Sequence, residues 1–411
     1  MTAVPRASEF ALPTASARPQ ASSFTVEAIR DLAAAETIWR ELEADGTSSP
    51  YQRFDWQKAY VEALAESRGF EPCVLLVRDC DSRPCLLLPL AIERRPGLSA
   101  AGAIGGKHAN YHLPLMAAGA ALPSPSALRA LLRQAGRRLG IDAYAFTNLP
   151  LSWRGLANPL ASGGRPSPSN GYRLTLAGSA EEVLARALSK DARKKLRQKD
   201  KKLRELGPVV HQVARTSAEI APILSAFLAQ KRDRFSATGI PDPFADAATQ
   251  SFLQRACLAG LGEARPAIEL HALMMGERVL ATFGAAVDAT RCCGMFTSFD
   301  ADPEIARSSP GELLMLEVIR HQCAQGRRVF DLGVGEARYK SSLCDEVEEL
   351  VDVTLPVTAR GHLYVAAFGG FLRLKRLVKQ TPWLWQGFTR LRSRLGASSR
   401  GAGDLPKRGT A

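Results

Sequence analysis

The sequence lacks the cysteine spacing of a disulfide framework or a zinc site. Its eight cysteines include no C-x-x-C pair, and two of them, Cys292 and Cys293, are adjacent. Thiols that follow no ligand or bridge pattern are usually buried and free in a reducing compartment. We therefore expect a cytoplasmic protein without disulfides and without a metal site.

Long hydrophobic runs are also missing. The longest stretch without Lys, Arg, Asp or Glu runs from His108 to Leu128, and asparagine and three prolines interrupt it. Such a segment is a poor candidate to span a bilayer. Residues 1–23 are rich in Ala, Ser and Pro but have no apolar core, which predicts a disordered leader rather than a signal peptide. A soluble or peripheral protein is expected.

The chain has a net charge of +13, and acidic residues are scarce in two segments that together carry +16. Lys190–Arg204 has nine Lys/Arg against two Asp, and residues 361–411 have ten against one. The basic balance therefore belongs to two local features and not to the folded body. A helix over the first of them could bind RNA, a nucleotide-linked substrate or lipid headgroups, or could simply be solvated. No aromatic residues alternate with its charges as in single-strand binders, so nucleic acid is not an expected partner.

The tail over 361–411 combines its charge with two apolar helical faces and two tryptophans, Trp383 and Trp385. One face carries Ala367, Phe371, Leu374 and Val378, and the other carries Leu384, Phe388, Leu391 and Leu395. Basic amphipathic helices with tryptophan suit an anionic membrane surface. The tail therefore predicts peripheral attachment at the inner membrane, and a helix packed on the second half of the chain is the alternative.

The order of predicted elements is the same in both halves of the chain. Each half reads as a strand, two helices, an antiparallel hairpin or meander, a helix and a strand, with no shared sequence motif. Capping boxes, for example Ser179 to Glu182, mark helix starts in the second half. The predicted division is a leader over 1–23, an N-terminal domain over 24–150, a Pro/Ser/Gly-rich linker over 151–171, a C-terminal domain over 172–360 and the tail over 361–411. The expected class is α/β (α+β), with two tandem domains that each have a mixed, mostly antiparallel sheet flanked by helices.

One candidate site is the helix start at Ser309-Pro310-Gly311, which follows a strand and a loop. Free N–H groups at a helix N-terminus bind phosphate, and a glycine lets an anion approach the backbone. The alternative is a capping box from Ser309 to Glu312 with proline in the first turn. Glu312 would then compete for the same amides.

A second candidate follows the predicted buried strand Arg328–Leu332. After the glycines of the segment FDLGVGEARYK come Arg338, Tyr339 and Lys340. Side chains beyond the end of a strand often line a crevice. Tyrosine can protonate a leaving group, and lysine or arginine can hold phosphate or carboxylate. The alternative is a solvated helix face.

Several stretches together resemble a known family. They are KDARKKLRQKDKKLRELG (190–207), FLAQKRDRF (227–235), residues 268–300, FDLGVGEARYKSSL (330–343), FDWQKAY (54–60) and GGKHANYHLP (105–114). They are similar to the CelD-type acetyltransferases of the GNAT superfamily, a group associated with cellulose or exopolysaccharide biosynthesis and akin to the Fem peptidyltransferases. The resemblance implies tandem GNAT-like domains and an acyl donor such as acetyl-CoA or another acyl-CoA.

The resemblance also implies roles for individual residues. Ser309, Pro310 and Gly311 would bind the pyrophosphate of the donor, and Tyr339 would protonate its leaving thiolate. The acceptor would contact Lys340, Arg338 and Tyr111. Asp300, with Asp302 and Glu304, is a candidate general base by position only. The glycine-rich pyrophosphate loop usual in the superfamily is absent, which leaves other activated acyl donors open.

The expected function is acyl transfer to an amine or hydroxyl of a sugar or cell-envelope precursor. Two alternatives use the same fold. One is a non-catalytic accessory role in polysaccharide synthesis, which the missing glycine loop favours. The other is Fem-like transfer from aminoacyl-tRNA, with the cationic helix on the tRNA.

Overall fold

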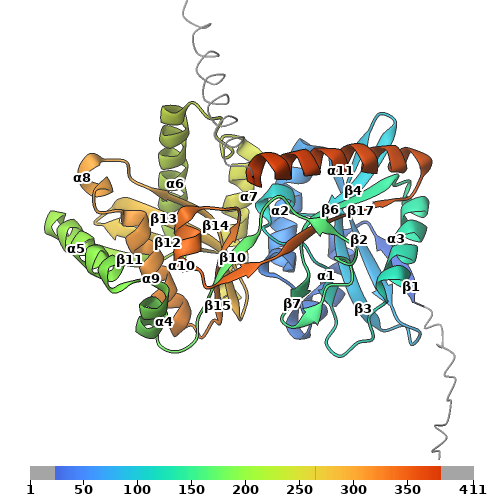
Figure 1. Ribbon diagram of the computed structural model, residues 1–411, viewed down its shortest axis with the longest axis horizontal. Helices are drawn as coiled ribbons and strands as arrows, with labels where there is room; N and C mark the ends of the chain where they lie inside the picture. The colour runs from blue at the N-terminus through green and yellow to red at the C-terminus, as the bar shows by residue number, and fades with distance from the viewer. Residues whose placement is uncertain (1–23, 264, 381–411) are drawn as a thin grey trace, which may run out of the picture.

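The computed structural model describes residues 24–263 and 265–380, without the side chains of Glu263, Arg338, Lys375 and Val378–Gln380. The leader predicted over 1–23 and the second apolar face of the tail lie outside the described residues. The described chain forms two halves that lie side by side, each built on its own sheet (Figure 1). The expected class is confirmed: both sheets are mixed, mostly antiparallel and flanked by helices.

The first sheet has the strand order β1-β2-β3-β4-β6-β17-β9, with β5 beside β3. The strands are β1 (Thr25–Ile29), β2 (Phe70–Arg78), β3 (Pro84–Arg95), β4 (Leu98–Ala103), β5 (Leu115–Met116), β6 (Ala143–Pro150), β9 (Arg165–Pro166) and β17 (Leu350–Pro356). The helices are α1 (Leu32–Asp45), α2 (Phe54–Arg68), α3 (Pro125–Leu139) and α11 (Ala359–Gln380). Alternate side chains of β2 and β3 pack against α3 on one face and α1 on the other.

The second sheet has the order β11-β12-β13-β14-β15-β10-β16. Its strands are β10 (Gly171–Thr175), β11 (Val209–Val213), β12 (Ile268–Met275), β13 (Arg278–Val287), β14 (Arg291–Phe299), β15 (Val329–Val334) and β16 (Glu346–Glu348). Its helices are α4 (Ala180–Ala187), α5 (Lys190–Leu206), α6 (Ser217–Thr238), α7 (Ala247–Leu258), α8 (Pro303–Ala306), α9 (Pro310–Ala324) and α10 (Arg338–Leu343). Helices α4 and α9 share a core with one face, and α6 and α7 share a core with the other.

The two halves repeat one topology, but the repeat starts later than the sequence predicted. The run β1-α1-α2-β2-β3-β4-α3-β6 corresponds to β11-α6-α7-β12-β13-β14-α9-β15, and in both the last strand is parallel to its neighbour. The second repeat therefore begins at β11, and β10, α4 and α5 precede it.

In each sheet, the last strand of the repeated run pairs with a further strand that does not belong to that run. Strand β17, expected in the second half because it falls within 172–360, pairs antiparallel with β6 of the first sheet. Strand β10 pairs in the same way with β15. The buried side chains of β17, Val351, Val353 and Leu355, belong to the core of the first half. The chain therefore returns to the first half before α11 begins.

Helix α11 packs on β4, β6 and β17 of the first sheet, so the predicted alternative of packing on the second half is wrong for it. Gly361 makes the closest approach, since an added Cβ there would lie 1.8 Å from the carbonyl oxygen of Asp142. The outward face of the helix is apolar, with Leu363 76%, Phe371 59% and Leu374 60% exposed. No helix among the described residues is long and apolar enough to cross a bilayer.

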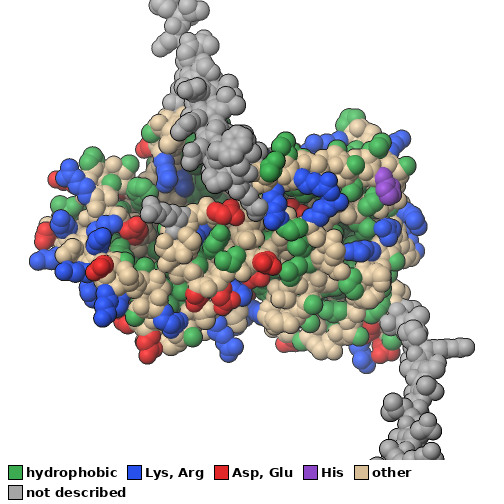
Figure 2. Space-filling model, in the orientation of Figure 1, with side chains coloured by type: hydrophobic (Ala, Val, Ile, Leu, Met, Phe, Trp, Pro, Cys, Tyr) green, Lys and Arg blue, Asp and Glu red, His purple; other side chains and the backbone are tan. Residues whose placement is uncertain are grey.

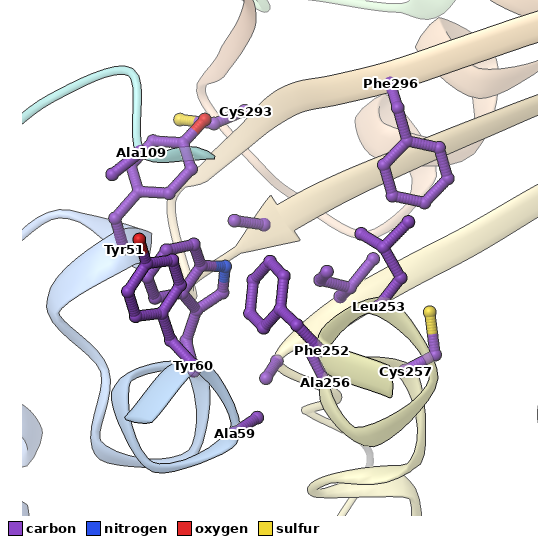
Figure 3. Close-up of a cluster of buried hydrophobic side chains, with 14 of the residues drawn as sticks. Tyr51, Ala59, Tyr60, Ala109, Phe252, Leu253, Ala256, Cys257, Cys293 and Phe296 are labelled. Carbon is purple, nitrogen blue, oxygen red and sulfur yellow. The ribbon is translucent and has the colours of Figure 1, made fainter. Parts of the chain in front are cut away.

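A shared hydrophobic core joins the two halves where α2 meets α7 (Figure 3). The Trp56 ring stacks on Tyr60 with centroids 5.5 Å apart and meets the edge of Phe252 at 5.1 Å. The buried guanidinium of Arg53 crosses the same boundary and donates to the backbone carbonyls of Pro266 and Val287. The buried apolar area on both sides and the Arg53 hydrogen bonds across the boundary make this a fixed contact.

Candidate functional site

The second sheet opens into a fork between β14 and β15. These parallel strands pair from Arg291↔Val329 only as far as Cys293↔Asp331, although β14 continues to Phe299. The pairing of β14 with β13 shifts register at the same point: Gly284 faces Phe296, but Ala285 faces Gly294. Met295 is therefore the extra residue of a β-bulge, which bends its strand locally.

The side chain of Asn110, from the first half, bridges the fork. Its Nδ2 donates to the carbonyl oxygen of Gly294 at 3.0 Å and to the hydroxyl of Tyr51 at 2.5 Å. Its Oδ1 accepts from the backbone N–H of Val334 at 3.2 Å. Gly333, at φ +74°, is needed here because an added Cβ would lie 2.5 Å from Asn110 Nδ2. The first half thus supplies a residue to the diverging strands of the second half.

A buried polar network lies beside the fork. The carboxylate of Asp331, with no exposed surface, accepts from the Tyr111 hydroxyl at 2.9 Å and the Gly333 N–H at 2.6 Å. Arg291 Nη1 lies 3.1 Å from Asp331 Oδ2, and its guanidinium lies 3.8 Å from the centre of the Trp153 ring. Burial raises the pKa of the Asp331 carboxyl, and the nearby Arg291 charge opposes that rise.

Helix α9 begins just beyond the outer end of β14. Ser309 has φ +50° and ψ +59°, and its side chain caps no backbone N–H, so the capping box that the S-x-x-E pattern predicts is not formed. Its hydroxyl instead accepts from Lys199 Nζ of α5 at 2.7 Å, and Lys199 also pairs with Glu312 at 2.9 Å. Glu312 is thereby drawn to Lys199 rather than to the first amides of α9. A Cβ added to Gly311 would have Phe299 at 3.7 Å as its nearest neighbour, so space remains there.

Cationic side chains flank this helix start from two directions. Lys199 comes from α5, over which Lys and Arg side chains gather on the surface (Figure 2). The guanidinium of Arg234, on α6, lies 5.6 Å from the centre of the Phe299 ring, which neighbours Gly311. Lys231, one turn earlier, lies within 6 Å of the rings of Phe227, Phe235 and Phe244, and burial lowers its pKa to about 8.

A comparison with known protein families finds a match in the second half of the chain. Residues 190–341 match the family model described as an acetyltransferase (GNAT) domain. Most of the second half is therefore similar to GNAT acetyltransferase domains. The matched segment runs from α5 into α10, so it contains the fork and the start of α9.

Among curated proteins no match was found. Among solved structures the chain is similar to FemX, at 8% identity over 83% of this chain and 99% of that chain, with a TM-score of 0.56. It is also similar to the C-terminal domain of a putative lysylphosphatidylglycerol synthetase from Agrobacterium fabrum (12% identity, 82% and 96% covered, TM-score 0.46). A third is a tandem GNAT protein from the clavulanic acid biosynthesis pathway (13% identity, 82% and 99% covered, TM-score 0.43). At these identities the likeness to FemX concerns the fold alone.

Tyr339 and Lys340, both predicted site residues of the GNAT domain, point in different directions from α10. Tyr339 is 48% exposed, whereas Lys340 is 7% exposed. Lys340 Nζ donates to the carbonyl oxygens of Gly333 and Val334 at 3.1 and 3.2 Å, so it holds the end of β15. Arg338 begins the helix, and its side chain lies outside the described part of the chain.

Two further predicted residues are engaged by protein groups. Asp300 forms an ion pair with Arg278 at 2.7 Å and accepts from the Asp302 N–H. Arg278 also pairs with Asp302 at 3.1 Å. Tyr111, expected to contact the acceptor, is fully buried with its hydroxyl on Asp331, so it joins the two halves instead. No sequence motif marked Asn110 or Arg234, whereas Lys199 belongs to the cationic segment 190–204 considered above as a binding surface. All three fall in stretches that carry the family resemblance.

Proposed function

We propose that the second half transfers an acyl group from an acyl-CoA donor to an amine or hydroxyl. The observation that carries the proposal is the fork between β14 and β15, which leads from Gly294 to the start of α9. The positive end of the α9 dipole, the unobstructed Gly311 and two flanking cations suit a diphosphate. In the first half the equivalent helix, α3, has its N-terminus capped by the Ser124 side chain, which favours the second half as the donor site.

In the proposed reaction the acceptor nitrogen or oxygen attacks the thioester carbon. The new bond to the acyl group forms as the carbon–sulfur bond breaks, and the acceptor's proton passes to solvent water. We propose that backbone N–H groups of β14 at the Met295 bulge stabilise the negative charge on the tetrahedral oxygen by donating hydrogen bonds to it. Tyr339, whose ring is partly exposed after the end of β15, is the proposed proton donor to the leaving thiolate. Lys340 supports the site by holding the β15 carbonyls in place.

For the acceptor, we propose a sugar or cell-envelope precursor of the kind implied by the resemblance to CelD-type acetyltransferases. The long cationic surface of α5 favours an acceptor or donor that carries phosphate. We further propose that the protein works in the cytoplasm at the inner membrane surface. The apolar outward face of α11, with the exposed cations Arg360 and Arg373 on the same helix, supports this placement.

A calorimetric titration with acetyl-CoA tests the proposed donor site. Wild type and Gly311→Gln are expected to bind, because Gly311 has room for a side chain. Gly311→Glu has the same size but adds a negative charge opposite the diphosphate, and its affinity should fall by at least about tenfold. Equal affinity of the two variants would place the donor elsewhere, and no binding to wild type would favour a non-catalytic role.

A further inference from the structure

The carboxamide of Asn110 replaces the backbone hydrogen bonds between two strands, β14 and β15, at the point where they diverge. Beyond Cys293↔Asp331, β14 and β15 are too far apart to pair. Asn110 spans the gap with one donor and one acceptor, bonded to the Gly294 carbonyl and the Val334 N–H. A side-chain amide has the same donor and acceptor groups as a peptide unit, so it satisfies both strands at once.

Several contacts fix this amide in position. The hydroxyl of Tyr51, a fully buried residue, accepts a third hydrogen bond from Asn110. The preceding residue, Ala109, is buried in the core shared by the halves, and the following residue, Tyr111, is bonded to Asp331. Glycines stand on both strands next to the amide, Gly294 and Gly333, and neither position leaves room for a side chain. The side chain of Asn110 is therefore held in place and closes the inner end of the fork between β14 and β15.

We propose that Asn110 sets the length of the acyl group that the fork accepts, and that the donor is a short-chain acyl thioester. This inference rests on the proposed donor site in the fork. A diphosphate at the start of α9 would direct the thioester from the outer end of β14 toward Gly294. A short acyl group ends before the amide. A longer one must displace it and leave the partly buried Gly294 carbonyl and Val334 N–H without their protein partner, which is unfavourable where an acyl chain excludes water.

The test is a calorimetric series with CoA, acetyl-CoA and hexanoyl-CoA. Wild type should bind acetyl-CoA at least about tenfold more tightly than hexanoyl-CoA. In Asn110→Ala this ratio should fall by about tenfold or more, while the affinity for CoA itself changes little. The matched control is Asn170→Ala, since Asn170 bonds Glu336 through its backbone N–H and lies outside the fork. Asn110→Ser serves in its place if the alanine variant does not fold.

The possible outcomes separate the inference from the proposed function. If wild type binds hexanoyl-CoA as tightly as acetyl-CoA, the inference is wrong whatever the variants do. It is also wrong if a folded Asn110 variant keeps the wild-type ratio. If wild type binds none of the three compounds, the proposed donor site fails as well.

Discussion

The hydroxyl of Tyr111 in the first half donates a hydrogen bond to the buried carboxylate of Asp331 on β15 in the second half, at 2.9 Å. Gly171 makes the contact possible, because a Cβ there would lie 2.2 Å from the same hydroxyl. The bond therefore depends on three segments of the chain that are far apart in sequence. It positions Asn110, the residue just before Tyr111, at the fork.

Tyr111→Phe should lower the free energy of unfolding by about 1.5–3 kcal/mol, because it removes a donor from a buried carboxylate and keeps the ring. Tyr144→Phe is the comparison, since the Tyr144 hydroxyl donates to a neutral carbonyl, that of Leu132, within one half. The second variant should lose about 0.5–1.5 kcal/mol. Urea unfolding measures both. A smaller loss for Tyr111→Phe than for Tyr144→Phe would contradict the importance given to Asp331.

Lys199→Ala should weaken acetyl-CoA binding by about tenfold or more, through two effects. The variant removes a cation from the start of α9 and also frees Glu312, which Lys199 now holds. Adding Glu312→Gln should therefore restore part of the affinity. Arg234→Ala, which lacks the second effect, should cost less. Lys201→Ala, an exposed position on the same helix, is the control. Calorimetry at two salt concentrations would show whether the losses are electrostatic, and equal losses for Lys199 and Lys201 would indicate only a general charge effect.

Tyr339→Phe should lower the turnover number by about 10²-fold or more while the donor affinity stays nearly unchanged, if Tyr339 protonates the thiolate. Lys340→Ala should behave differently, because Lys340 is buried on the Gly333 and Val334 carbonyls. It should lower stability by about 1–3 kcal/mol, with any rise in the acceptor KM following from the displaced β15 end. Steady-state kinetics together with thermal unfolding separate the two roles. Full activity of Tyr339→Phe would remove that residue from the mechanism.

Acidification should destabilise the protein between pH 6.5 and pH 4. Burial lowers the pKa of His108, His211 and His321 from 6.5 to about 4, so the unfolded chain takes up protons in this range while the folded chain does not. Stability is therefore retained above pH 6.5 and lost as the pH falls toward 4. His108 lies among Tyr60 and Phe252, so His108→Phe should fit and should make the loss less steep. An unchanged slope in urea unfolding across this range would contradict the assignment.

The tail should bind anionic vesicles at low salt and release them as salt rises. Headgroup attraction contributes about 1 kcal/mol for each well-placed Lys or Arg, and the exposed apolar residues of α11 add to it. Sedimentation of the full chain is compared with Leu363→Ser/Leu374→Ser, a variant that changes only outward-facing positions. Weaker sedimentation of the variant is expected. If neither protein sediments with anionic vesicles at low salt, or if both sediment equally, the proposed membrane attachment through α11 is wrong.

Local pattern was sufficient to predict most elements of the fold. Trp56, Tyr60 and Leu64 follow one another at i+4 spacing, which indicates a helix, and the structure has α2 there. The turns near Gly276 and Asp288 divide residues 268–300 into three apolar runs, which indicate the meander found as β12, β13 and β14. The placement of β17 could not be predicted in this way. Its apolar alternation suits any half-buried sheet edge, and only long-range pairing with β6 decides between the two sheets.

The candidate site was predicted in part, since the helix start at Ser309–Gly311 and the residues after β15 are where the pattern placed them. The left-handed backbone of Ser309 was not, because S-x-x-E is typical of a capping box and the contact with Lys199 is distant in sequence. Asn110 carries no charge and no motif. Its importance comes from the bulge at Met295 and the divergence of two strands, which no local pattern encodes.

The central claim is that the fork and the start of α9 hold the donor, and hydrogen exchange with and without saturating acetyl-CoA tests it most directly. Bound donor should slow the exchange of amides over 294–299 and 311–313, and it should leave the amides of α11 unchanged. Protection at the corresponding strand and helix of the first half, or no protection anywhere, would contradict the claim.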